Sequence, residues 1–446
     1  MHRRRPHERT PNDGEIETPR TRMKRRKNRW TRATRSFLKL VLIVTLVTAF
    51  AYLTVIRWAT TSTTISVRLP VANVDIQVPN ATEWPLTHII NTRFMQEQGY
   101  LTTLGMARLH LFRTFCLPTM VKQSSQEFIW IIKTDPNLDD DILHELLQDL
   151  QAYDNFYLVA SNENFLINPE SPGAWRDGAE GMDILKAKIY TGNLTVLHQA
   201  IALRESRPIL ETRLDADDGL HRLFVEYIQL VAAQRFLDPE LNWLYWCSRR
   251  HLEWHASANA TIGDTGPSKG AILPVRHTKL CTTPGLTVGY NVDVKVEEVP
   301  LHPHDVLYRN VINSTECYNQ KLAADSPCLV LVDDLVFVSV RSRTLTSAGM
   351  LKVDLEYVIK AELEEKLWLV LEDRFAFNET MARQTQDYLT RHQTQIAYEN
   401  LLGQCTRGHS CKPQAQNQLK IYIDDESKLE KVYTDKFLRQ VRIPVI

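Results

Sequence analysis

The sequence predicts an α/β fold built on a mostly parallel sheet with helices on both faces. Between about residues 88 and 231, short apolar runs of strand length alternate with segments whose apolar residues recur at helical spacing. Residues 128–132 (FIWII) are apolar at every position, as expected for a strand buried on both sides. A third observation is a short strand at residues 208–214 that ends in clustered aspartates. Together these observations indicate repeated strand–helix–strand units.

The elements follow one another in a regular order. The first strand is expected before a helix with Leu104, Leu111 and Phe115 on its apolar face. The last helix of the series follows the aspartates, with Phe224, Ile228 and Val231 facing the core. The predicted strands are residues 88–91, 128–132, 156–159 and 208–214, and the predicted helices are residues 104–119, 142–150, 194–201 and 224–231.

Three carboxylates follow the fourth strand, at Asp215, Asp217 and Asp218, before Gly219 lets the backbone turn away. Ligands bind at the carboxyl ends of strands in α/β sheets. Carboxylates this close repel one another, so a divalent cation such as Mg²⁺ or Mn²⁺, bridging to substrate phosphates, would account for the cluster. A solvated acidic turn is the alternative. An EF-hand is excluded because Leu220 stands where that loop needs glycine and a strand precedes it.

Several common nucleotide and hydrolase motifs are missing from the sequence. Neither G-x-G-x-x-G nor G-x-x-x-x-G-K-[ST] occurs, which disfavours the dinucleotide-binding and P-loop classes. G-x-S-x-G is also missing, which disfavours a serine hydrolase. If phosphates are bound, a metal must therefore carry much of their charge.

The N-terminal region predicts a membrane anchor. The chain is formally neutral, with 53 basic and 53 acidic residues, but residues 1–39 are strongly basic. The uncharged run at residues 40–56 is just long enough to span a bilayer, and the basic side should stay cytoplasmic. A nucleic-acid arm and a cleaved signal peptide are the alternatives, and we favour a type II protein of the Golgi or ER membrane with a lumenal body. The predicted parts are a tail (1–39), an anchor (40–58), a stem (59–85), a catalytic domain (86–350) and a helical C-terminal extension (351–446).

Cysteines and glycosylation motifs agree with a lumenal body. All seven cysteines and all five Asn-x-Ser/Thr motifs follow the anchor. Close spacing favours the disulfides Cys405–Cys411 and Cys317–Cys328, and an odd total leaves at least one thiol unpaired. The predicted glycosylation sites are Asn80, Asn193, Asn259, Asn313 and Asn378.

Four motifs in combination resemble the putative rhamnosyltransferase family, which is similar in layout to the GT-A glycosyltransferases. They are FCLPTMVKQSSQEFIWIIKTD (115–135), TRLDADDGLH (212–221), PGLT (284–287) and GQCTRGHSC (403–411). The resemblance covers about residues 86–412. It implies a GT-A-like fold, a nucleotide-sugar donor and a glycan or glycoconjugate acceptor, with no role for nucleic acid.

The resemblance also implies roles for particular residues. Asp217 would bind Mn²⁺ or Mg²⁺, and Asp215 would face the donor ribose or a metal-bound water. Asp218 would shape the loop or contact the donor sugar. A downstream histidine would complete the metal site, and His302 and His304 are the candidates. The expected donor-binding residues are Asp135, Arg213, Asp215, Asp218, Gly285 and Thr287, the glycine and threonine belonging to a loop at residues 284–290.

Alternatives stay open for several of these residues. Asp135 could instead cap a turn, and Arg213 could pair with Glu211. If the reaction inverts the sugar, a carboxylate must act as base, and the sequence does not choose among the candidates Asp333, Asp334, Glu297 and Glu298. Asp333 and Asp334 could also form a hairpin turn between two strands.

The predicted function is metal-dependent transfer of a sugar, such as rhamnose, from a nucleotide sugar. The alternative is a catalytically inactive lumenal protein that binds glycans or acts as a scaffold on the same fold. The intact acidic loop favours the enzyme, because a binding module does not need carboxylates aimed at a diphosphate.

Overall fold

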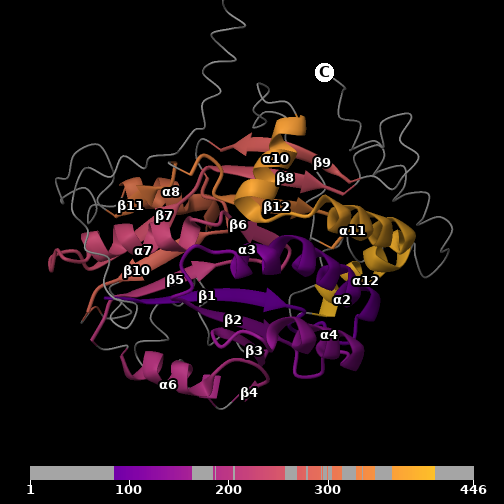
Figure 1. The fold of residues 1–446 in the computed structure, drawn as a ribbon, viewed down its shortest axis with the longest axis horizontal. Helices are drawn as coiled ribbons and strands as arrows, with labels where there is room; N and C mark the ends of the chain where they lie inside the picture. The colour runs from indigo at the N-terminus through magenta and orange to yellow at the C-terminus, as the bar shows by residue number, and fades with distance from the viewer. Residues whose placement is uncertain are drawn as a thin grey trace, which may run out of the picture. The chain divides into compact units, whose positions relative to one another are not determined.

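The computed structural model describes residues 85–162, 184–185, 187–203, 206–256, 269–277, 280–292, 294, 299, 304–313, 328–333, 335–346 and 364–406. These residues form two sheets with helices packed around them (Figure 1). Within these ranges, no helix is long and apolar enough to cross a membrane. The predicted anchor at residues 40–58 and all but the last residue of the predicted stem (59–85) lie outside the described residues.

The large sheet has eight strands in the order β11-β7-β10-β5-β1-β2-β3-β4. Its centre is parallel, since β1 pairs in parallel with β2 and β5, and β2 with β3. β10 runs antiparallel between β5 and β7. The strands are β1 (Thr87–Phe94), β2 (Ile129–Thr134), β3 (Phe156–Ala160), β4 (Lys188–Ile189), β5 (Ile209–Arg213), β7 (Trp243–Cys247), β10 (Leu286–Tyr290) and β11 (Leu329–Leu331).

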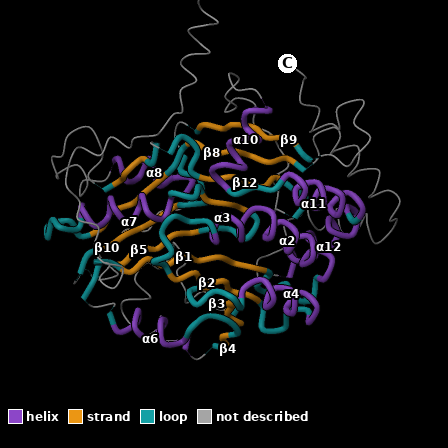
Figure 2. Tube along the Cα trace, in the orientation of Figure 1, coloured by secondary structure: helices purple, strands orange, loops and turns teal. Residues whose placement is uncertain are grey.

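Helices cover both faces of this sheet, as the alternation of strands and helices predicts. Consecutive residues of β1 enter different cores, because side chains alternate across a strand. Ile90 packs in the core that includes α2 (Thr102–Leu111), α4 (Asp140–Leu150) and α7 (Phe224–Arg235). Ile89 packs in the other core, with α6 (Leu194–Ala202) and α8 (His304–Asn313). Figure 2 shows these helices around the strands.

The predicted helix at residues 104–119 is interrupted. α2 continues into the π-helical segment η1 (Phe112–Cys116) and then α3 (Leu117–Val121), which has Pro118 in its first turn. The π-helical segment brings Phe115 against the second sheet, where its ring lies 4.9 Å from that of Trp254. Such segments are frequent at functional sites.

The small sheet has four strands in the order β6-β12-β8-β9. They are β6 (Asp218–Leu220), β8 (Arg250–His255), β9 (Ala271–Arg276) and β12 (Ser339–Arg343). β6 follows β5 of the large sheet directly, so the acidic loop joins the two sheets. The sequence did not predict this second sheet.

The prediction of a hairpin as the alternative for Asp333 is wrong, because β11 belongs to the large sheet and β12 to the small one. The predicted donor loop at residues 284–290 is also wrong in part. Residues 286–290 form β10, which is buried at every position between β5 and β7. Only the turn at Gly285, whose φ is +80°, precedes the strand.

Three C-terminal helices pack onto this framework: α10 (Glu364–Phe375), α11 (Glu379–Arg391) and α12 (Gln393–Thr406). α11 and α12 contact α2, and α10 contacts β9. The Glu399 carboxylate of α12 accepts a hydrogen bond of 2.7 Å from the Leu104 N–H, which supplies the capping acceptor that the start of α2 otherwise lacks. Leu345 in turn accepts from the side chain of Asn400. These helices are therefore part of the packed core.

Candidate functional site

The acidic loop follows β5, one of the two central strands of the large sheet. β5 ends at Arg213, and the Leu214 N–H still donates to the Asn91 carbonyl of β1 at 2.9 Å. A turn then forms in which the Asp218 N–H donates to the Asp215 carbonyl at 3.1 Å. The loop thus begins at the carboxyl end of a parallel strand, where the sequence predicted it.

The side chain of Asp218 connects the loop to β12 of the small sheet. It is buried, and one carboxylate oxygen accepts from the Ser342 N–H at 3.0 Å. The other oxygen lies 3.8 Å from Arg341 Nε. Burial and the neighbouring Asp217 carboxylate raise the pKa of Asp218 well above its ordinary value. With its oxygens held in this way, Asp218 positions the loop and is poorly placed to hold a ligand.

Asp215 is accessible and compensated by arginine. Its side chain is 31% exposed, and one oxygen lies 3.4 Å from the Arg213 guanidinium. Burial opposes its ionisation, but Arg213, Arg341 and Arg93 outweigh that effect and lower the pKa of Asp215. Arg213 does not pair with Glu211, the predicted alternative, since the Glu211 carboxylate is buried and accepts from the Tyr290 hydroxyl at 2.5 Å.

Asp217 is half-buried. Its negative charge is less well compensated by arginine than that of Asp215. Asp217 accepts a hydrogen bond of 3.1 Å from the Ser342 hydroxyl. Burial and the charge of Asp215 raise its pKa, which Arg108 and Arg341 only partly offset. A cation placed beside Asp215 and Asp217 would relieve this repulsion.

Arginines from separate elements surround the acidic loop. Arg93 lies on β1, Arg213 on β5 and Arg341 on β12. Arg108 of α2 is fixed by hydrogen bonds to the Gln98 side chain at 2.6 Å and to the Thr346 carbonyl at 3.1 Å. One guanidinium group can donate two parallel hydrogen bonds to the oxygens of a phosphate, so several arginines around the loop suit a diphosphate.

Gly219 does not act as the flexible turn that the sequence predicted. It lies in the middle of β6 and pairs with Val340 of β12. A Cβ at this position would be 2.6 Å from the Phe115 carbonyl oxygen and 2.8 Å from the Thr119 methyl group. The glycine is required because η1 and α3 press closely against β6.

The oxygen ligands available at the acidic loop fit a divalent cation that is held by two carboxylates and keeps other ligand positions open. They do not fit a site in which protein side chains supply every ligand. Asp215 and Asp217 offer hard oxygen ligands, and Mg²⁺ commonly binds through one or two carboxylates while keeping waters and phosphate oxygens. Across the described residues, no cluster of three or more His, Cys, Asp or Glu side chains could hold a metal. The structure therefore does not join His304 to the two aspartates. His304 begins α8, which packs on the edge strand β11, and His302 lies outside the described residues.

Three predicted donor-binding residues lie within or directly beside strands of the large sheet. Asp135 is buried after β2, where it accepts from the Asn137 N–H at 2.8 Å and so forms the turn that was its alternative role. Thr287 is buried in β10, 2.6 Å from the Thr212 hydroxyl. Gly285 is closest to the acidic loop, since its N–H donates to the Arg213 carbonyl at 2.9 Å.

The structure does not identify a catalytic base. Asp333 follows the edge strand β11, and its carboxylate lies 3.3 Å from the Arg249 guanidinium. Glu297, Glu298 and Asp334 lie outside the described residues. The assignment of the base among these carboxylates stays a prediction.

A buried cluster beside the acidic loop was not predicted. His251, Glu253 and His255 alternate along β8 and so share one face of the small sheet. The Glu253 carboxylate lies 3.1 Å from His251 Nε2 and 3.2 Å from His255 Nε2, and also pairs with Arg343. The spacing H-x-E-x-H in residues 251–255 is the signal that could have revealed it.

Arg341 joins this cluster to the acidic loop. On β12 it pairs in register with Asp218 on one side and with Glu253 on the other. Burial opposes ionisation of Glu253, but hydrogen bonds from the two histidines and the charge of Arg343 hold its pKa far below the ordinary range. The small sheet thus places a second buried carboxylate next to the arginine that faces the aspartates.

The structure contains one disulfide that the sequence did not predict, and the two predicted disulfides stay predictions. Cys247, at the end of β7, is bonded to Cys281 across 34 residues, a pair that close spacing could not suggest. Cys116 is a buried free thiol, as the odd total required. Cys328 is disulfide-bonded, while Cys317, Cys411 and the side chain of Cys405 lie outside the described residues.

Two predicted glycosylation sites are helix caps. Asn193 caps α6 by accepting from the Thr195 N–H, and Asn378 caps α11 by accepting from the Thr380 and Met381 N–H groups. Asn80, Asn259 and the side chain of Asn313 lie outside the described residues.

Comparison with a protein-family model gives one match, over residues 101–167, to the family described as "Putative rhamnosyl transferase". The match spans α2 to β3 and ends before the acidic loop. It confirms the predicted family resemblance over these residues and agrees with the prediction of a glycosyltransferase. No curated protein sequence matches the chain.

Solved structures of S. aureus TarS are also similar, each at 12% identity. TarS 1-349 is matched over 80% of this chain and 81% of its own, with a TM-score of 0.21. A second TarS structure is matched over 78% and 55%, with a TM-score of 0.25. TarS 1-349 in complex with UDP is matched over 78% and 92%, with a TM-score of 0.18. TM-scores of this size do not establish a common fold.

Proposed function

We propose that the chain is a metal-dependent, GT-A-like glycosyltransferase that moves a sugar from a nucleotide-sugar donor to a glycan or glycoconjugate acceptor. The observation that carries this proposal is the acidic loop at the carboxyl end of β5, with two half-buried carboxylates among four arginines. The family match over residues 101–167 supports it and suggests rhamnose as a donor sugar.

In this proposal, aspartates of the loop bind the cation and nearby arginines bind the phosphates of the donor. Asp215 and Asp217 would hold Mn²⁺ or Mg²⁺, which when bound supplies Lewis-acid stabilisation of the diphosphate leaving group. Arg213 and Arg93, near Asp215, would bind the same phosphates and offset the charge that develops as the sugar departs. Asp218, held by Ser342 and Arg341, keeps the two binding carboxylates in place.

We further propose that the body is lumenal and anchored in the Golgi or ER membrane by residues 40–58. The Cys247–Cys281 disulfide is in keeping with an oxidising compartment. Protease treatment of sealed microsomes tests this. The body should be protected until detergent is added, and cleavage in intact vesicles would contradict the topology.

A turnover assay tests the enzymatic proposal. The purified chain is incubated with a panel of nucleotide sugars, with and without Mn²⁺, and release of nucleoside diphosphate is measured. We expect Mn²⁺-dependent release from at least one donor and a loss of about 10²-fold or more in Asp217→Ala. The exposed Asp140→Asn variant, on α4, is the matched control and should keep full activity.

No release from any donor, or release unchanged in Asp217→Ala, would contradict the proposal. The alternative, an inactive lumenal glycan-binding or scaffold protein, predicts the first of these results.

A further inference from the structure

Ser342, on β12 of the small sheet, contacts two of the three aspartates of the acidic loop. Its N–H donates to an Asp218 carboxylate oxygen at 3.0 Å, and its hydroxyl donates to Asp217 Oδ2 at 3.1 Å. The residue is 4% exposed, so little of it is open to solvent. The first hydrogen bond belongs to the backbone and would survive a change of side chain, whereas the second depends on the hydroxyl group.

Strand pairing on both sides of β12 fixes the position of this hydroxyl. All five residues of β12 pair in parallel with β8, and three of them also pair antiparallel with β6. Ion pairs flank the serine, since Arg341 Nε lies 3.8 Å from Asp218 and Arg343 pairs with Glu253 of β8. A serine side chain has one torsion angle before its oxygen, so a fixed backbone leaves the hydroxyl few other positions.

The hydrogen bond from Ser342 to Asp217 comes from a neutral group. Asp215, by contrast, lies 3.4 Å from the guanidinium of Arg213, a charged partner that partly neutralises it. A neutral donor can orient a carboxylate without cancelling its charge, and that charge stays available to attract a cation. The Ser342 hydroxyl is therefore a suitable partner for a carboxylate that binds a metal.

Two arginines compete for the Asp217 carboxylate. Burial and the charge of Asp215 raise the pKa of Asp217, but Arg108 and Arg341 act in the opposite direction, so both guanidinium groups lie within electrostatic range of it. A guanidinium that paired fully with this carboxylate would occupy the oxygens that a cation needs. The hydrogen bond from Ser342 opposes such a rotation of the carboxylate towards an arginine.

We propose that Ser342 is a positioning residue for the cation, an inference that rests on the function proposed above. Its hydroxyl holds the Asp217 carboxylate in the orientation that binds Mn²⁺ or Mg²⁺. Carboxylates that bind metals are themselves held by hydrogen bonds, and loss of such a partner typically costs about 10–100-fold in metal affinity or activity. Ser342 thus determines how tightly the acidic loop binds its cation without touching the cation itself.

This role also explains why the acidic loop leads into a second sheet. β6 begins within the acidic loop and pairs directly with β12, which carries the serine. The pairing brings the hydroxyl to the loop from a segment more than 120 residues away in the sequence. The small sheet therefore supplies the metal site with a hydrogen-bond donor that the large sheet does not provide.

Binding of Mn²⁺ to the full chain, measured by electron paramagnetic resonance, tests the proposal. Ser342→Ala removes the hydroxyl and keeps the backbone N–H that holds Asp218, and we expect the Kd for Mn²⁺ to rise about tenfold. Ser342→Thr keeps a hydroxyl group on a side chain that suits a strand, so it should restore the wild-type Kd. If Ser342→Ala does not fold, Ser342→Cys replaces it, because a thiol has nearly the same shape and donates only weakly.

Ser339→Ala is the matched control on the same strand. Ser339 is fully buried in β12, and its hydroxyl has no hydrogen-bond partner among the described residues. This variant removes a buried serine hydroxyl that does not contact the aspartates. It should leave the Kd for Mn²⁺ unchanged.

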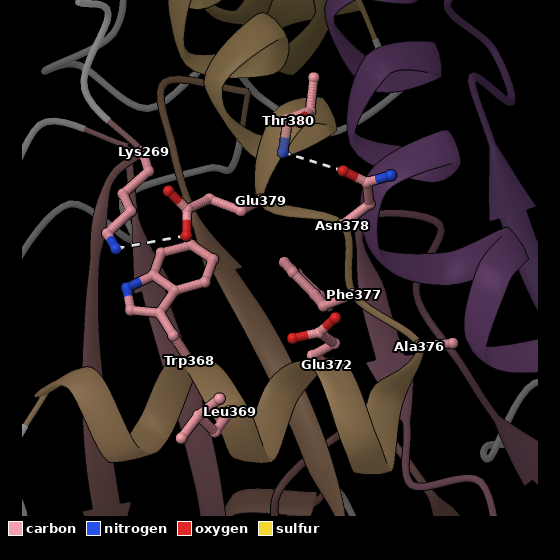
Figure 3. A pocket seen from close by; sticks show the side chains of 9 residues that line it. All are labelled: Lys269, Trp368, Leu369, Glu372, Ala376, Phe377, Asn378, Glu379 and Thr380. Carbon is pink, nitrogen blue, oxygen red and sulfur yellow. Dashed lines mark hydrogen bonds and ion pairs between the residues drawn. The ribbon is translucent and has the colours of Figure 1, made fainter.

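A second control lies at the opposite edge of the small sheet. β9 is the strand farthest from β6 in that sheet, and Lys269, just before β9, lies 3.4 Å from the Glu379 carboxylate. Figure 3 shows this ion pair in a pocket of about 610 Å³, whose lining includes none of the three aspartates and no residue of β12. Glu379→Gln weakens the pair and should not change the Kd for Mn²⁺. A tenfold rise in this control would show that any disturbance of the small sheet alters metal affinity, and it would overturn the specific role of Ser342.

An equal Kd for Mn²⁺ in the wild type and Ser342→Ala would overturn the positioning role. An equal loss of affinity in Ser342→Ala and Ser339→Ala would also overturn it, as would a folded Ser342→Thr variant that binds as weakly as Ser342→Ala.

Nucleoside diphosphate release by the wild type separates the two proposals. Metal-dependent release together with an unchanged Kd in Ser342→Ala would mean that only the positioning role is wrong. Weaker Mn²⁺ binding in Ser342→Ala, with no release from any donor by the wild type, would mean that only the enzymatic proposal is wrong. A wild type that binds no Mn²⁺ would contradict both.

Discussion

Three aspartates within four positions occupy different environments. Asp218 is buried and held by β12, Asp215 is paired with Arg213, and Asp217 is half-buried with a pKa raised by burial and by the charge of Asp215. The sequence predicted the cluster and its place at a strand end, because both depend on neighbouring residues. It could not predict Arg341 and Ser342 as partners, since they lie more than 120 residues away.

Gly219 is expected to tolerate no side chain. Gly219→Ala places a Cβ against the carbonyl oxygen of Phe115. This oxygen belongs to the backbone, so it cannot move away by a change of side-chain rotamer. We expect the free energy of unfolding to fall by about 1–3 kcal/mol and donor turnover to fall with the displaced loop. Urea unfolding and nucleoside diphosphate release measure both effects. Unchanged stability and turnover would show that β6 and η1 are not packed as described.

Glu253 should stabilise the protein in a pH-dependent way. Its folded pKa is lowered below the ordinary value of 4.5, so its contribution is fully present above that pH and is lost as the pH falls towards the folded pKa. Glu253→Gln should cost about 3–5 kcal/mol at pH 7, because two histidines and Arg343 lose their carboxylate. The cost should shrink by about 1.4 kcal/mol per pH unit below pH 4.5. Urea unfolding at pH 7, 4.5 and 3.5 measures it, and a cost independent of pH would contradict the account.

At the scale of elements, the first four predicted strands and the helices between them are confirmed as β1, β2, β3 and β5 with α2, α4 and α6. The local pattern of apolar residues was enough to predict these strands because each of them is buried on both faces. It failed for β10, whose PGLTVGY sequence has glycines that suggested a loop. Gly289 is needed inside this strand, since a Cβ would lie 2.6 Å from Leu210 and 2.8 Å from Trp246. Such close packing depends on the neighbouring strands and leaves no local pattern.

The contact between α12 and α2 gives a prediction at this scale. Glu399→Ala removes the acceptor of the Leu104 N–H, and Gln395 loses a partner at 2.8 Å. We expect a loss of about 1–3 kcal/mol in the free energy of unfolding, as for a hydrogen bond to a charged group. Denaturant unfolding measures it, with the exposed Glu240→Gln variant as control. A loss no larger than that of the control would mean that the C-terminal helices do not stabilise α2.

At the scale of the whole molecule, the site depends on segments far apart in the sequence. The carboxylates follow β5, one arginine comes from β1, another from α2 and a third from β12 of the second sheet. The C-terminal helices then hold α2 and the residues that follow β12. The sequence predicted an appended extension here, because amphipathic periodicity identifies a helix but not the surface it covers.

The central claim is that the acidic loop binds a divalent cation together with a nucleoside diphosphate. Electron paramagnetic resonance titration of Mn²⁺, with UDP as the probe nucleotide, tests it directly in the wild type and in Asp217→Asn, which preserves side-chain shape. The account predicts one Mn²⁺ bound per chain, tighter with UDP than without it, and binding at least tenfold weaker in the variant. Equal Mn²⁺ affinity in the two proteins, or no effect of UDP on wild-type binding, would contradict it.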